Sequence, residues 1–245
     1  MKQAQRCHID ADQLTALAQD HGWLWTPPQG QAVACLILAH GAGAPMDSGF
    51  MNLMAGKLAA RGVGVVRFEF PYMAQRRIDG SKRPPNPTPK LLECWRQVYE
   101  QVEPRVQGTL AVGGKSMGGR MASLLADELG ADALVCLGYP FYAAGKPEKP
   151  RTEHLAQLRT PTLIVQGERD ALGNRLAVEG YTLSRRIELC WLAAGDHDLK
   201  PLKASGFSHE QHLEAAAEAV AGFLQADVSS GPGGARGVPA ASRRL

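Results

Sequence analysis

The stretch 111–120 reads A-V-G-G-K-S-M-G-G-R, and within it Gly114, Ser116 and Gly118 form the pattern GxSxG. An apolar run precedes this stretch and a helix-like segment, 117–129, follows it. A serine on a tight turn between a strand and a helix needs small residues two positions to either side, because the two backbones approach closely there. The stretch therefore predicts a strand, a strained turn at Ser116 and a helix.

The same letters allow two other interpretations. Gly114, Lys115 and Ser116 also match the end of the phosphate-binding loop GxxxxGK[ST], whose first glycine would fall on Thr109. Residues 109–112 resemble a strand, whereas a phosphate-binding loop needs irregular backbone with free N–H groups. The mismatch disfavours nucleotide binding. A glycine-rich turn without chemistry is the third interpretation, and the rest of the chain must decide.

Composition indicates an ordinary globular protein. The chain has 245 residues, 44% of them hydrophobic, and a formal net charge of +3, which does not indicate a nucleic-acid-binding surface. Its five cysteines are widely spaced, without a CxxC motif or a Cys/His metal cluster, which is typical of a reducing compartment. The N-terminus lacks an apolar signal segment and no stretch approaches 18 apolar residues. We therefore expect a cytoplasmic protein with no membrane, nucleic-acid or metal partner.

Short apolar runs alternate with helix-like segments along the chain. The runs predict strands at 33–39, 63–70, 109–113, 133–138, 162–166 and 187–192. The segments between them predict helices at 50–61, 90–102, 117–129, 152–158, 174–183 and 209–226. Several runs are apolar throughout, as in parallel strands that are buried on both faces. This alternation predicts one α/β domain over 1–228, a mostly parallel doubly wound sheet without a large lid domain.

Three further segments complete the predicted organisation. Residues 23–26 are expected to add an outer strand. Residues 73–89, with four prolines and several basic side chains, are expected to form a stiff basic loop and not a helix. Residues 229–245, rich in Gly, Ala, Ser and Pro, are expected to be a disordered tail.

Two later loops carry the partners that a nucleophilic serine requires. Such a serine needs a base and an acid to orient that base, and in the α/β-hydrolase arrangement these follow in the order Ser, Asp or Glu, then His. Asp170 comes after the strand 162–166, and His197 after the strand 187–192. Glu168 is the alternative acid and His209 the alternative base. Asp170 could instead cap a helix, and His197 could be an exposed loop residue.

An oxyanion hole requires two backbone N–H groups, one from the residue after the nucleophile and one from the loop after the first central strand. Met117 supplies the first. The loop that follows the strand 33–39 reads H-G-A-G-A, and Ala42 is the preferred second donor, with Gly41 and Gly43 as alternatives. His40 is expected to hold this loop by a hydrogen bond rather than to act as a second base.

Several stretches also carry a resemblance to a known family. They are L-A-H-G-A-G-A-P-M-D-S at 38–48, F-E-F-P-Y-M at 68–73, G-G-K-S-M-G-G-R-M-A-S at 113–123, P-T-L-I-V-Q-G-E-R-D at 161–170 and G-D-H-D-L-K-P at 195–201. Over about 33–224 the chain resembles the KANSL and Tex type of α/β-hydrolase-like proteins, a group of uncharacterised bacterial predicted hydrolases. The resemblance implies the α/β-hydrolase fold and the triad Ser116, Asp170 and His197. It implies no substrate.

These observations together predict a serine hydrolase that cleaves a small acyl ester or thioester through an acyl-enzyme, without a metal or an organic cofactor. Arg76, Arg77 and Tyr139 are expected to bind the substrate, because loops over the strand ends carry specificity in this fold. The alternative for the two arginines is that their side chains only face solvent and do not contact the substrate. A binding or assembly scaffold with little turnover remains the alternative function.

Overall fold

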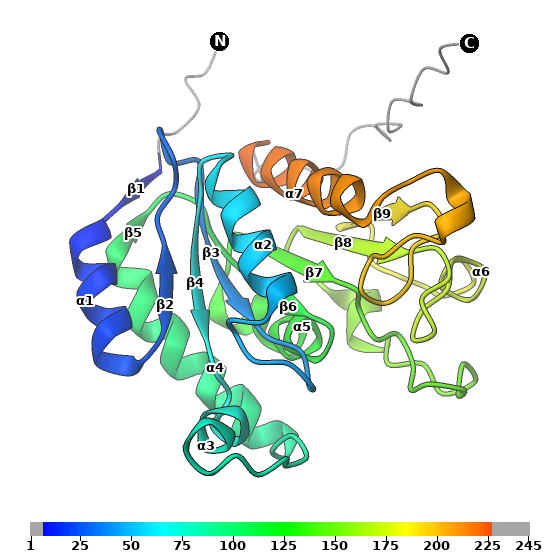
Figure 1. The fold of residues 1–245 in the computed structure, drawn as a ribbon, viewed down its shortest axis with the longest axis horizontal. Coiled ribbons are helices and arrows are strands. Elements are labelled where there is room, and N and C mark those ends of the chain that lie inside the picture. The colour runs from blue at the N-terminus through cyan, green and yellow to red at the C-terminus, as the bar shows by residue number, and fades with distance from the viewer. Residues whose placement is uncertain (1–6, 227–245) are drawn as a thin grey trace.

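A seven-stranded sheet forms the centre of the structure, a computed structural model that describes residues 7–226 (Figure 1). The strand order is β2-β4-β3-β6-β7-β8-β9. All neighbours in the sheet are parallel except β2, which pairs antiparallel with β4. The bounds are β2 (Leu24–Thr26), β3 (Ala34–Ala39), β4 (Val63–Phe68), β6 (Leu110–Lys115), β7 (Ala133–Leu137), β8 (Thr162–Gly167) and β9 (Ile187–Leu192).

Helices cover both faces of this sheet, and each face has its own apolar core. On one face, α2 (Gly49–Ala59) and α7 (His209–Gln225) pack against residues such as Leu36 and Leu38 of β3. On the other, α1 (Ala11–His21), α4 (Thr88–Val102) and α5 (Met117–Leu129) pack against the alternate residues, such as Ile37. Because successive side chains of a strand point to opposite faces, the five inner strands are buried along their whole length. This double burial explains the continuous apolar runs in the sequence.

Most of the predicted elements are confirmed to within a few residues, including the outer strand, which is β2. Two predicted helices are shorter than expected. The segment 152–158 forms only a 3-10 turn, η2 (His154–Gln157), and the segment 174–183 forms α6 (Arg175–Val178). A glycine at position 180 lies just beyond the end of α6, and the following residues run irregularly to β9.

The prediction that residues 73–89 form a loop is wrong in part. Residues 73–79 belong to α3 (Pro71–Asp79), which begins with a proline at its first turn and ends at Gly80, whose φ is 70°. A proline in the first turn is compatible with a helix because its missing N–H would have no helical partner there. The four prolines used against a helix all follow Gly80, and the last of them, Pro89, lies in the first turn of α4. Only 80–87 is irregular.

An N-terminal helix and a small second sheet were not predicted. Asp10 caps α1 by accepting a hydrogen bond from the N–H of Gln13, and Gly22 closes the helix with a φ of 66°. The strands β1 (His8–Ile9) and β5 (Val106–Gln107) pair antiparallel, and the 3-10 turn η1 (Glu103–Arg105) leads into β5. The expected tail at 229–245 lies outside the described residues. A third 3-10 turn, η3 (Lys203–Ser205), precedes α7.

All five cysteines are free thiols, three of them buried and two half-buried. Between residues 7 and 226, none of the helices has both the length and the apolar character that crossing a lipid bilayer demands.

We predict that Trp95→Ala lowers the free energy of unfolding by about 3 kcal/mol or more, the usual effect of truncating a buried aromatic side chain. Trp95 of α4 is 0% exposed and packs edge-to-face on Phe68 of β4, with a centroid distance of 4.9 Å. Urea denaturation measures the change. Leu176→Ala is the control, because its side chain is 86% exposed and its loss should change stability by no more than about 0.5 kcal/mol. Equal effects of the two substitutions would contradict the core described above.

Candidate active site

A sharp turn between β6 and α5 places Ser116 in strained backbone. Ser116 has a φ of 51° and a ψ of −117°, a conformation that non-glycine residues seldom adopt. A Cβ added to Gly114 would lie 2.5 Å from backbone atoms of Gly118 and Gly119, and one added to Gly118 would lie 2.6 Å from the carbonyl oxygens of Ala39 and His40. The two glycines of GxSxG are therefore required by backbone contact, as predicted.

Ser116, His197 and Asp170 form one hydrogen-bonded chain. The Ser116 Oγ lies 2.8 Å from Nε2 of His197, and Nδ1 of His197 lies 2.8 Å from Oδ2 of Asp170. An ionised carboxylate can only accept, so Nδ1 carries the proton and Nε2 accepts from the serine hydroxyl. The arrangement can remove a proton from Ser116 and hold the resulting imidazolium against a carboxylate.

The Asp170 carboxylate is fully buried and its two oxygens are held in place. Oδ1 accepts from the N–H of Leu172 at 2.7 Å, and Oδ2 accepts from Nε2 of Gln166 at 2.9 Å as well as from His197. Gln166 is itself buried and also bonds to both backbone groups of Tyr139. Sequence reasoning did not single out Gln166, although it is the one amide side chain in the apolar run 162–166 and stands four residues before the acid.

The loop that carries His197 packs directly on the end of β8. A Cβ at Gly167 would lie 2.3 Å from the carbonyl oxygen of Asp196 and 2.5 Å from that of Gly195. Within the loop, the N–H of Asp196 donates to the carbonyl of Lys200, and the N–H of Leu199 donates back to the carbonyl of Asp196. His197 is therefore presented by a short, internally bonded turn on the carboxyl edge of the sheet.

The loop 40–43 adjoins Ser116 and is held by hydrogen bonds from the side chains of His40 and Tyr72. His40 is fully buried and its pKa is lowered by that burial, so the neutral ring donates from Nδ1 to Gly41 O at 2.6 Å and accepts at Nε2 from the N–H of Phe70. The hydroxyl of Tyr72 donates to the carbonyls of Gly41 and Ala42. The structural role expected of His40 is confirmed.

The Ala42 N–H of this loop points away from His40 and Tyr72. In a trans peptide the C=O and the following N–H point in opposite directions, so binding of the Gly41 carbonyl by His40 and Tyr72 turns the Ala42 N–H away from them. A Cβ at Gly41 would lie 3.7 Å from the Cβ of Ser116. Within residues 7–226, the N–H groups of Met117 and Ala42 donate no backbone hydrogen bond. Both N–H groups belong to segments that adjoin Ser116.

The alternative acid and base are occupied elsewhere. Glu168 accepts from the N–H of Ala194 at 2.9 Å and pairs with Arg175 at 3.0 Å. His209 lies at the start of α7, as expected, with Nε2 3.0 Å from the carbonyl oxygen of Asp198. Neither residue bonds to Ser116 or to His197 in the structure.

The three expected substrate-binding residues have different surroundings. Arg76 of α3 is half-buried and its Nη1 lies 3.5 Å from the carbonyl oxygen of Gly43, beside the loop 40–43. Arg77 is paired with Glu69 and Asp47, at 2.6 Å each, and these hydrogen bonds raise its pKa. The Arg77 guanidinium is therefore already engaged in ion pairs with other residues of the fold.

The expectation for Tyr139 does not fit the structure. Its side chain is 0% exposed, and its hydroxyl donates to the carbonyl of Arg151 at 3.2 Å. Aromatic packing against Phe141, with ring centroids 4.9 Å apart, holds the ring inside the core below β7. A fully enclosed ring offers no surface to a substrate.

The phosphate-binding interpretation is excluded by the backbone. Residues 110–115 form strand β6, and the Lys115 ammonium lies 2.8 Å from the carbonyl oxygen of His197 instead of facing an open loop. Across the described residues, His, Cys, Asp and Glu side chains nowhere gather in a group of three or more that could hold a metal ion.

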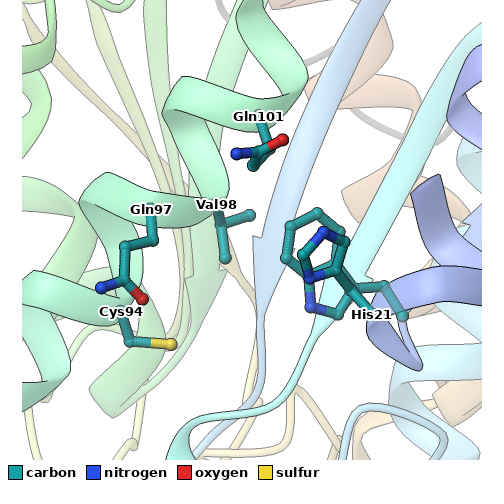
Figure 2. A pocket seen from close by; sticks show the side chains of 6 residues that line it. His21, Cys94, Gln97, Val98 and Gln101 are labelled. Atoms are coloured by element: carbon teal, nitrogen blue, oxygen red, sulfur yellow. The ribbon is translucent and has the colours of Figure 1, made fainter.

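A pocket of about 360 Å³ lies away from these residues, between α4 and the segment that joins α1 to β2 (Figure 2). Its lining is mainly apolar, with the stacked rings of His21 and Trp23 at a centroid distance of 4.6 Å facing Cys94 and Val98 of α4. It contains none of the residues around Ser116, so it is separate from the candidate active site.

Comparison with known proteins gives the class. Residues 32–225 match a family described as an alpha/beta hydrolase domain. The fold and the hydrogen bonds that link Ser116, His197 and Asp170 are thus those of an α/β hydrolase. The chain belongs to the α/β hydrolase domain family, because the match covers most of its length. The finer resemblance to the KANSL and Tex type stays a prediction.

Solved structures share the fold at low sequence identity. A serine hydrolase without a lid from Xanthomonas campestris is 19% identical, with a TM-score of 0.62 over 86% of this chain and 90% of that one. Est1E from Butyrivibrio proteoclasticus with bound ferulic acid is 17% identical, with a TM-score of 0.61 over 85% and 95%. A dienelactone hydrolase from Anabaena variabilis is 20% identical, with a TM-score of 0.61 over 82% and 89%.

We predict that Gly114→Ala destabilises the protein by roughly 1–3 kcal/mol, because its Cβ would meet backbone atoms that cannot move independently. Gly222→Ala is the matched control: it lies inside α7 with no atom within 4 Å of the added Cβ, and alanine should be neutral or stabilise by up to about 1 kcal/mol. Chemical denaturation of both variants checks the contrast. A Gly114 variant as stable as the wild type would show that the turn is not tightly packed.

Proposed function

We propose that this α/β hydrolase is a serine hydrolase in which Ser116 is the nucleophile, His197 the general base and Asp170 the residue that orients the base. The observation that carries the proposal is the unbroken hydrogen-bonded chain from the Ser116 Oγ through both ring nitrogens of His197 to Asp170. Burial of Asp170 and its fixed partners support the same roles.

The reaction follows from these positions. Ser116 Oγ attacks the carbonyl carbon of the substrate while its proton passes to Nε2 of His197. The imidazolium then protonates the leaving group, and an acyl-enzyme remains on Ser116. Water, activated by the same imidazole, hydrolyses the acyl-enzyme and returns the serine to its free form.

The negative charge on the substrate oxygen needs donors that are already in place. The N–H of Met117 starts α5, where helix N–H groups have no intrahelical partner and the helix dipole favours an anion. The N–H of Ala42 comes from the loop that packs against Ser116. We assign these two groups as the oxyanion hole.

The proposed substrate is a small acyl ester or thioester. The similar Est1E structure contains ferulic acid, a carboxylic acid of modest size, and so supports an acyl group of that scale. The mechanism uses only side chains and backbone groups of this chain and a water molecule. The cytoplasmic location expected from cysteine usage remains a prediction.

We predict that Ser116→Ala abolishes covalent labelling by a fluorophosphonate probe and lowers hydrolysis of a short p-nitrophenyl ester by at least about 10³-fold. The reason is that the only attacking oxygen is removed while the fold around it is kept. Gel fluorescence after labelling and an absorbance assay measure the two effects.

Ser81→Ala is the control for non-specific labelling, because that serine is exposed in the segment after α3. Its labelling should equal that of the wild type. Undiminished labelling of the Ser116 variant would contradict the assignment of the nucleophile. A wild-type protein that neither reacts with the probe nor turns over esters and thioesters, yet purifies with a stoichiometric partner, would favour the scaffold alternative.

For substrate choice, we propose that Arg76 favours an acyl group that carries a carboxylate or phosphate. Arg76→Gln should raise KM for such an ester about tenfold and leave a neutral ester of the same size unchanged, because one charge-assisted hydrogen bond is lost. Steady-state kinetics at low and high salt measure the difference, which salt should reduce for this half-buried group.

Arg77→Gln is the comparison, since its guanidinium is already paired with Glu69 and Asp47. It should change stability more than the selectivity between anionic and neutral esters. Equal turnover of both esters by the wild type, insensitive to salt, would reject a role for the basic side chains in specificity.

A further inference from the structure

A buried lysine stands next to the nucleophile. Lys115 is the last residue of β6, and its side chain is only 9% exposed. Its Nζ donates to the carbonyl oxygen of His197 at 2.8 Å and lies 3.2 Å from Oδ1 of Asp198. A charged side chain that leaves the nucleophile's strand therefore reaches the main chain of the base.

The Lys115 side chain is packed on several sides, and its hydrogen bond to His197 is partly buried. The Phe50 ring of α2 lies 5.5 Å from Nζ, and a Cβ added to Gly138 would lie 3.2 Å from Nζ and 2.7 Å from the carbonyl oxygen of His197. Burial lowers the pKa of Lys115, while the nearby Asp198, Asp170 and Asp196 act in the opposite direction. Since burying an ammonium costs several kcal/mol, fold stability alone does not account for a lysine here.

The His197 loop depends on this contact for one of its fixed points. The turn from Asp196 to Lys200 is closed by its own backbone bonds, and Ala194 and Leu199 on either side of His197 have φ values of 53° and 62°. Across residues 7–226, no backbone N–H donates to the His197 carbonyl. Its donor is the Lys115 ammonium.

We propose that Lys115 is a positioning residue that holds the main chain of His197 in register with Ser116. Lys115 and Ser116 are consecutive, so the hydrogen bond from Nζ ties the base to the same strand end that presents the nucleophile. Both residues are then attached to the end of β6: Ser116 by its peptide bond to Lys115, and His197 by the hydrogen bond from Nζ. This shared attachment keeps Nε2 of His197 2.8 Å from the Ser116 Oγ. This inference rests on the proposed function, because it assigns Lys115 a part in the same reaction.

The hydrogen bond to the carbonyl, and not the ion pair, carries this role. The Asp198 carboxylate is 71% exposed, where an ion pair contributes little because solvent screens it. The carbonyl oxygen of His197 is the nearer partner of Nζ, at 2.8 Å against 3.2 Å for the carboxylate. The two contributions can therefore be separated by substitution.

The test compares three variants. Lys115→Met keeps the length of the side chain but removes the donor, and should lower kcat for a p-nitrophenyl ester about 10-fold to 100-fold with KM changed less than about threefold, the effect of a displaced catalytic group. Lys115→Arg, which keeps the donors and the charge, should recover part of kcat. Asp198→Asn should stay within about threefold of the wild type.

Proton NMR provides a readout that needs no turnover. The Nδ1 proton of His197, bonded to Asp170, is expected to give a downfield resonance that is absent from His197→Gln. Lys115→Met should broaden or shift this resonance, Asp198→Asn should not, and circular dichroism should show all variants folded.

The outcomes separate the two ideas. A wild type without labelling or turnover rejects the proposed function, and the NMR comparison still tests whether Lys115 positions His197. An active wild type whose Lys115→Met variant keeps kcat and the downfield resonance overturns the positioning role. The positioning role is also overturned if Lys115→Met and Lys115→Arg lose kcat only in proportion to their loss of folded protein, and if the His197 Nδ1 resonance of the protein that remains folded is the same as in the wild type.

Discussion

The close contact between the backbones of β6 and α5 is the constraint on which the site depends. At Gly114 the two segments meet with no space for a Cβ, a Cβ at Gly118 would meet the carbonyl oxygens at the end of β3, and Ser116 between the two glycines is held at a φ of 51°. Such a conformation persists only where the surroundings hold it in place, and here the two parallel neighbours of β6, which are β3 and β7, and the helices on both faces of the sheet do so. Strain in one residue is thus maintained by the packing of the whole sheet. The benefit is a hydroxyl that stands clear of the sheet and within reach of His197.

Much of the fold could be predicted because its signals are local. The runs that became β3 and β6 are apolar on both faces, and their order with the intervening helices implies a parallel sheet. The positions of Asp170 and His197 followed from the rule that parallel strands bring their carboxyl ends to one edge. A carboxylate after β8 and a histidine after β9 were then sufficient to identify the two residues.

What the sequence did not reveal depends on context that is not local. The helix α3 was missed because prolines beyond Gly80 were weighed together with residues before it, although Pro71 is typical of a helix start. The helix α1 offered a cap at Asp10 and a closing glycine, but its apolar face is short. Gln166 bonds to the backbone of Tyr139, 27 positions away, and Lys115 to the His197 carbonyl, 82 positions away, and no spacing rule in the sequence predicts either contact.

Two glycines at strand ends, Gly138 and Gly167, have a consequence for how this site can diversify. Both press directly on carbonyl oxygens of the loop that carries His197, so one wall of the site is made of main chain. Main chain presents the same atoms whatever the residue, and exchange of side chains cannot reshape it. The loop 40–43, which also adjoins Ser116, is instead contacted by the half-buried side chain of Arg76 from α3. Exchange of a side chain such as Arg76 can therefore change the surroundings of Ser116, while the main chain that contacts the His197 loop keeps the same atoms and geometry.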